Sequence, residues 1–177
     1  VGVTLEQLQA LVQESDGGCF SRYLAETLRG QDFASTAWAP SGAGVLGSSL
    51  TYAMPAPKDV PEAVRRLVTI PATITGTVKM WLKVSDRADE MIILQHSSTE
   101  GFIYSDRFHV EYIYSFRRTD PAEGRLAVRV WARAVWIKPL PWTHSFLKRM
   151  VEGEVATETA GQFPKLLRIV EEGCRTG

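Results

Sequence analysis

The stretch Lys138-Pro139-Leu140-Pro141-Trp142 divides a β-rich, aromatic-rich part of the chain from a C-terminal segment of helical character. Before it, β-branched and aromatic side chains indicate strands near residues 49–54, 67–70, 78–84, 91–96, 107–117 and 125–137. After it, apolar side chains recur at helical spacing, at Phe146, Leu147, Met150, Val151, Val155, Phe163, Leu167 and Val170. This order predicts an α+β fold in which a strongly curved antiparallel sheet wraps around a long C-terminal helix and encloses something apolar.

Two short helices are predicted before the sheet. Thr4 and Gln7 have the spacing of a capping box, and the apolar pattern that follows them stops at Ser15-Asp16-Gly17-Gly18. A second apolar pattern predicts a helix over residues 20–28. In the C-terminal helix, Pro164 lacks a backbone donor and disfavours helix at the residue before it, so a bend or break is expected there.

The strand-like run from Phe108 to Phe116 has an aromatic face that alternates with a mostly polar one. His109 and Glu111 share the polar face, which turns both away from a cavity bounded by Tyr112. The next run carries the small residues Ala132 and Ala134 in mid-strand, and these leave room beneath the helix. The two runs therefore predict a cavity on the aromatic side of the sheet.

The chain has 177 residues, which fits one domain over residues 1–177 with enough buried surface to fold unaided. Lys plus Arg and Asp plus Glu are 20 each, so no global positive field attracts nucleic acid, and attraction to a membrane requires a local patch. Cys19 and Cys174 have no Cys or His at ligand spacing, which favours free, reduced, cytosolic thiols. The chain carries no leader and no long apolar span, so we expect a soluble unit that could come from a longer, anchored protein.

The motifs that resemble catalytic or cofactor sites lack the context these sites need. The glycines of residues 42–47 have dinucleotide-loop spacing, but they fall in a Pro-, Ser- and Gly-rich segment before a strand, which predicts a loop over 38–47. His144-Ser145 has no elbow motif around the serine. His96 and His109 have no clustered acidic or Cys partners in the sequence, so no metal site is expected. We expect no cofactor and no enzyme activity.

In the order and spacing of its motifs, the chain resembles the VASt domain, a StAR-related lipid-transfer-like module of the Aster and Lam sterol transporters and plant relatives. The resemblance covers nearly the whole chain. It is carried by residues 20–28 with Phe33 and Trp38, the run Ser48-Ser49-Leu50-Thr51-Tyr52-Ala53-Met54-Pro55 with Pro57-Lys58, residues 108–114 and 125–128, and Pro141-Trp142 with Phe146-Leu147.

The resemblance implies a START-like helix-grip fold that holds a sterol or similar lipid between the sheet and the C-terminal helix. The family's entrance loop follows a strand ending in Tyr-x-x-Pro, which places a lid at Met54, Pro55, Ala56, Pro57 and Lys58. Lys58, Arg65 and Arg66 lie beside this lid and are expected to contact membrane. The residues expected to line the cavity are Tyr52, Met80, Tyr104, Phe108, Tyr112, Tyr114, Trp136, Phe146 and Met150.

The leading hypothesis is a non-enzymatic domain that binds a lipid, sterol first, and transfers it between membranes. The alternatives are an interaction or regulatory module of the same fold with a filled cavity, and an enzyme of the same class, a cyclase or hydrolase, working inside the pocket. A cavity larger than about 300 Å³ favours the first over the second. By the resemblance, the expected setting is cytoplasmic, at the endoplasmic reticulum or another membrane contact site, as a monomeric domain of a larger membrane-anchored protein.

Overall fold

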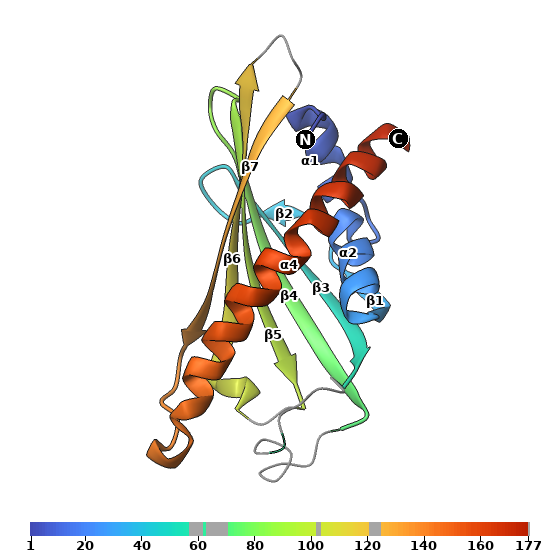
Figure 1. Cartoon of the computed structure of the whole chain (residues 1–177). Coiled ribbons are helices and arrows are strands. Elements are labelled where there is room, and N and C mark those ends of the chain that lie inside the picture. Colours follow the sequence, from blue (N-terminus) through green and yellow to red (C-terminus); the bar gives the residue numbers. More distant parts are fainter. Residues whose placement is uncertain (57–61, 63–70, 102–103, 121–124, 177) are drawn as a thin grey trace.

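The fold is an open antiparallel sheet with helices on one of its faces (Figure 1). It comes from a computed structural model that describes residues 1–56, 62, 71–101, 104–120 and 125–176. In chain order the described elements are α1 (Leu5–Val12), α2 (Gly18–Leu28), β1 (Gln31–Ser35), β2 (Ala39–Pro40), β3 (Val45–Pro55), β4 (Thr73–Val84), β5 (Glu90–Glu100), η1 (Ser105–Arg107), β6 (Phe108–Asp120), β7 (Arg125–Trp136), η2 (Trp142–His144) and α4 (Phe146–Thr176).

The two N-terminal helices form as predicted. The Thr4 side chain accepts from the Gln7 backbone, and the Gln7 side chain accepts from the Thr4 backbone, so both partners of the predicted capping box are in place. The apolar face of α1 is buried. Helix α2 begins at Gly18, two residues earlier than predicted, and ends at Leu28, with Arg29 in a left-handed conformation as its C-cap.

The strand order is β1-β3-β4-β5-β6-β7, with β2 also paired to β3, and the sheet is not closed into a barrel by the described residues. Each strand from β3 to β6 pairs antiparallel with the strand that follows it in the chain, so that β7 pairs with β6. Strand β1 has no counterpart in the sequence-based expectations. It is short, polar, and carries Asp32 at a positive φ, so alternation does not mark it. The predicted strand over residues 67–70 lies outside the described residues.

The predicted loop over residues 38–47 is partly wrong, because β2 and the start of β3 form a hairpin there. Gly42, Ala43 and Gly44 all have positive φ and reverse the chain. The backbone of Val45 then pairs with Lys83 of β4, four residues before the predicted start at Ser49. Pairing with a central strand outweighs the low strand propensity of the glycines. As predicted, the glycine motif opens no helix, so it does not form a dinucleotide loop.

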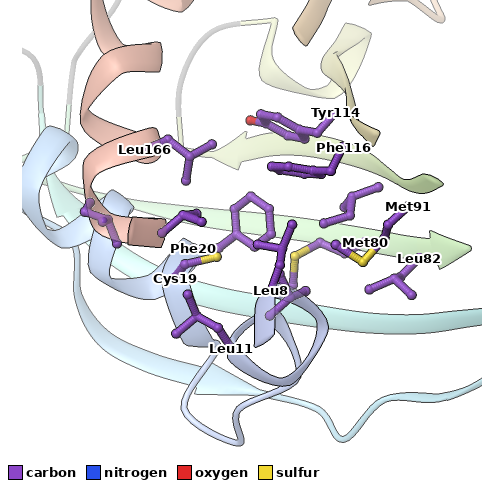
Figure 2. Close-up of a cluster of buried hydrophobic side chains, with 14 of the residues drawn as sticks. Leu8, Leu11, Cys19, Phe20, Met80, Leu82, Met91, Tyr114, Phe116 and Leu166 are labelled. Carbon is purple, nitrogen blue, oxygen red and sulfur yellow. The ribbon is translucent and has the colours of Figure 1, made fainter. Parts of the chain in front are cut away.

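The hydrophobic core lies between the sheet and all three described α-helices. Figure 2 shows Phe20 of α2 among Leu8 of α1, Leu166 of α4 and the sheet residues Met80 and Tyr114. The rings of Phe20 and Tyr114 are 5.7 Å apart, within the range of favourable aromatic pairs. The second half of α4 is thereby fixed to α2 and the middle of the sheet.

A bend or a break was expected at Pro164; helix α4 continues through this residue, so there is no break. Pro164 removes the hydrogen bond to residue 160, but Leu166, Ile169 and Val170 immediately after it are buried in the core. Because these three side chains are packed in the core, the helix stays continuous although one backbone hydrogen bond is missing. The buried position in this turn is Leu166 and not Leu167, which the sequence pattern had placed on the apolar stripe.

Candidate ligand-binding site between the sheet and the C-terminal helix

A cavity of about 110 Å³ lies between α2, α4 and strands β5 to β7. Strand alternation positions its floor, because Tyr112, Tyr114 and Val130 face α4 while their sequence neighbours face away. Its lining residues are Tyr23, Leu24, Thr27, Leu28, Gln95, Ser97, Tyr112, Tyr114, Val130, Glu158, Thr159, Gln162, Phe163 and Leu166. A larger hollow of about 710 Å³ is an open groove on the outer face of the sheet, beside Ile92 and Trp131, and is not enclosed by any described helix.

Polar groups gather in the cavity between the sheet and α4. The side-chain oxygens of Gln95 and Gln162 are buried and have no hydrogen-bond partner among the described residues. Burial raises the pKa of Tyr23 to about 12 and also raises the pKa of Tyr112 and Tyr114, so all three hydroxyls stay protonated. The cavity therefore offers hydroxyl donors and amide groups to a ligand that carries a polar group at one end.

Glu158 is the acidic residue at this cavity. Glu158 is exposed at the rim of the cavity, but partial desolvation by the surrounding side chains raises the pKa of its carboxyl group, and the nearby Glu154 raises it further. A raised folded-state pKa means that the protonated carboxyl stabilises the fold at low pH, and this stability is lost as the pH rises through that pKa.

We expect Glu158→Gln to be more stable than the wild type at about pH 7 and equally stable at about pH 4, because Gln resembles the protonated side chain. Urea unfolding of both proteins across this pH range measures the difference. A difference that stays constant with pH would contradict the assignment, as would a less stable variant at neutral pH.

The predicted lining residues fall into three groups. Tyr112 and Tyr114 line the cavity, with ring centroids 6.1 Å apart. Tyr52 and Met80 instead belong to the core and do not line it. The Tyr52 ring covers Gly76, where a Cβ atom would be closer than 3.0 Å to it. The others, Tyr104, Phe108, Trp136, Phe146 and Met150, lie toward one end of the sheet.

We call this end of the sheet the distal end. The register of β3 to β7 places five strand-terminal residues there: Pro55, Thr73, Glu100, Phe108 and Trp136. The rings of Phe108 and Trp136 are 4.8 Å apart, and the buried Trp136 Nε1 has no hydrogen-bond partner among the described residues. At the same end the Tyr104 hydroxyl is hydrogen-bonded to His144 Nδ1, and Arg107 lies over the Tyr104 ring. His144 thus pairs with a tyrosine.

The described part of the predicted lid also lies at the distal end. Met54 is half-buried, Pro55 is exposed, and the Ala56 N–H donates to the Ala72 carbonyl at 3.1 Å, which brings the two ends of the segment between them together. The remaining predicted lid residues and all three predicted membrane contacts, Pro57, Lys58, Arg65 and Arg66, lie outside the described residues.

Sequence reasoning missed an exposed apolar surface at this end. Ile137, Trp142 and Phe146 have exposed fractions of 61%, 87% and 46%, and all lie between β7 and the first turn of α4. We call these three residues the tip. Lys138, Lys148 and Arg149 are exposed next to them. The signal was present in the Pro141-Trp142 motif, but exposure could not be derived from it.

The expectation that His96 and His109 lack an acidic partner is wrong. Pairing of β5 with β6 sets Glu111 opposite His96, and the two side chains are 3.2 Å apart. His109 and Glu111 lie on the outer face, as the alternation predicted, and His96 lies there too, so none of the three faces the cavity. Partial burial, with His96 nearby, lowers the pKa of His109.

Compared with known proteins, the chain matches no family model and no curated protein.

Among the described helices, none has an apolar stretch long enough to cross a bilayer. Cys19 and Cys174 are both free thiols.

Proposed function

We propose that the chain is a lipid-binding domain of the helix-grip type, with a sterol as the first candidate ligand, which it transfers between membranes. The lipid lies between the distal half of the sheet and the first half of α4. The proposal is supported by the sheet order, by the helix across one face of the sheet and by the placement of the aromatic residues.

The observation that carries the proposal is the unequal packing of α4. Its second half is anchored in the core by Leu166, Ile169 and Val170. In its first half, Leu147 and Val155 are buried but lie outside that core cluster, and Phe146 is nearly half exposed. A helix anchored at one end can move away from the sheet at the other, which admits an elongated apolar ligand from the distal end.

The polar cavity supports a sterol-like ligand over a purely apolar one. A sterol has one hydroxyl on a rigid apolar body, and its site requires a few polar groups at one end of a large apolar surface. Gln95, Gln162 and Tyr112 provide such groups beneath the middle of α4. The hydroxyl end of the sterol enters first, and its apolar body then lies between the distal half of the sheet and the first half of α4.

The tip supports contact with a membrane at the end through which the lipid enters. Trp is a residue typical of the membrane–water interface, and each Lys or Arg near an anionic surface contributes about 1 kcal/mol. Trp142 and its basic neighbours combine the two features. The proposed setting is therefore a peripheral, reversible attachment.

Replacing Trp142 by Ala is expected to lower partition onto anionic vesicles about tenfold, because a Trp side chain contributes of the order of 1.5 kcal/mol when it leaves water. Co-sedimentation with phosphatidylserine vesicles measures this. Trp131→Ala is the matched control, since Trp131 is 50% exposed in mid-strand on the outer face. Equal losses in the two variants would contradict docking by the tip.

The second candidate is an interaction module of the same fold, and one observation favours it. The cavity of 110 Å³ is smaller than the roughly 300 Å³ typical of small-molecule sites. Native mass spectrometry of the purified domain separates the two functions. A co-purified lipid, together with saturable binding of a fluorescent sterol, supports the first, and the absence of both supports the second.

A further inference from the structure

Two strands place His96, His109 and Glu111 together on the outer face of the sheet. His96 of β5 is directly opposite Glu111 of β6, and His109 precedes Glu111 by two residues and so shares its face. One potential ligand atom from each of the three lies within 4.8 Å of the other two. This group faces away from α4 and is independent of the lipid site.

The separations are close to those of a metal site. Ligand atoms about 2.1 Å from a tetrahedral Zn²⁺ are about 3.4 Å apart. His96 Nε2 and Glu111 Oε2 are already 3.2 Å apart. The other ligand-atom separations are at most 4.8 Å, so bringing the three atoms to the spacing of a Zn²⁺ site requires a shift of at most about 1.4 Å.

One ring nitrogen of His109 is available as a metal ligand. Its Nε2 atom is buried and has no hydrogen-bond partner among the described residues. Its ring is stacked on His96, with centroids 4.4 Å apart and planes inclined by 29°. The group therefore combines two imidazoles and one carboxylate, which are ligand types that Zn²⁺ accepts.

Neighbouring side chains hold two of the three ligands in position. Arg133 binds Glu111 Oε1 through two nitrogens, at 2.6 and 2.7 Å, which leaves Oε2 directed at His96. The Trp81 ring meets the His96 ring edge-on at 4.9 Å. Hydrogen bonds to a ligating carboxylate, such as those from Arg133 to Glu111, are characteristic of metal sites, where they fix the orientation of the ligand.

We propose that His96, His109 and Glu111 form a binding site for a divalent transition-metal ion that prefers nitrogen and carboxylate ligands, with Zn²⁺ first. Three protein ligands leave a fourth position for water. An open groove of about 410 Å³ beside both histidines gives that water access. Because Arg133 and the nearby Lys79 are cationic, the affinity is moderate.

Titration of the purified domain with Zn²⁺ tests the site. We expect one equivalent to bind saturably by calorimetry. In the NMR spectrum the imidazole signals of His96 and His109 shift and those of His144 do not. Co²⁺ should give the visible bands of four-coordinate nitrogen–oxygen ligation. Thiolate charge-transfer bands would instead assign the metal to a cysteine and overturn the proposal, as would the lack of saturable binding.

Variants separate a metal site from a structural cluster. His109→Gln and Glu111→Gln should each weaken Zn²⁺ binding at least tenfold, whereas His144→Gln, the remaining histidine of the chain, should leave it unchanged. His96→Gln gives a third ligand variant in case one of the others fails to fold by circular dichroism. Wild-type affinity in any folded ligand variant, or an equal loss in His144→Gln, would refute the site.

Discussion

Gly18→Ala is expected to lower the free energy of unfolding by about 3 kcal/mol or more. Gly18 begins α2 with a φ of +56°, a conformation that costs an L-residue roughly 1–2 kcal/mol. A Cβ atom there would also come closer than 3.0 Å to the carbonyl oxygen of Leu11. Because that oxygen belongs to the backbone of α1, the overlap is relieved only by separating the two helices.

Chemical unfolding monitored by circular dichroism measures this change. Gly153→Ala is the matched control, because Gly153 lies inside α4 with no atom within 4 Å of an added Cβ, and Ala is the better helix former. The control should gain about 0.5–1 kcal/mol. If both variants were within 0.5 kcal/mol of the wild type, the packing of α1 on α2 described above would be incorrect.

Ala134→Phe is expected to reduce binding of a fluorescent sterol more than tenfold while the protein stays folded. Ala134 pairs with Val110 near the distal end of the sheet, and alternation along β7 turns it toward α4. A benzyl group there occupies the space assigned to the apolar body of the lipid. Because that space is hollow in the proposed function, the added side chain meets little resistance from the protein.

The same variant discriminates the two candidate functions through its stability. If side chains fill the interior, as in the interaction module, Phe at this position overpacks it and lowers the free energy of unfolding by about 1–3 kcal/mol. Ala127→Phe is the matched control, since Ala127 is on the same strand but exposed on the outer face. A destabilised Ala134→Phe, or sterol affinity equal to that of Ala127→Phe, would count against lipid binding between β7 and α4.

Local signals account for what the sequence predicted correctly. The Thr4 capping box, the alternation along residues 108–116 and the apolar spacing of the last segment each act through neighbours a few residues away, and each is found in the structure. These signals were sufficient for the order of the main elements. They also assigned Tyr112 and Glu111 to opposite faces of β6.

Non-local contacts account for what the sequence could not predict. The continuity of α4 through Pro164 depends on burial of Leu166 against α2 and the sheet. The meeting of His96 with Glu111 depends on the register of two strands, and a shift by one residue would separate them. Neither the packing partner nor the register is encoded in the spacing along one segment.

Strand β7 is the last strand of the described sheet, and its outer edge has consequences for self-association. The backbone of Val1 exchanges two hydrogen bonds with Leu126, which covers the start of this edge. Farther along this edge, a second copy of the chain could add its own β7 as an antiparallel strand. If Trp131 of one copy were opposite Trp131 of the other, Arg129 of each copy would lie opposite Arg133 of the other. Like charges directly opposite each other destabilise strand pairing. The arginines of β7 therefore oppose edge-to-edge pairing of two copies in this register.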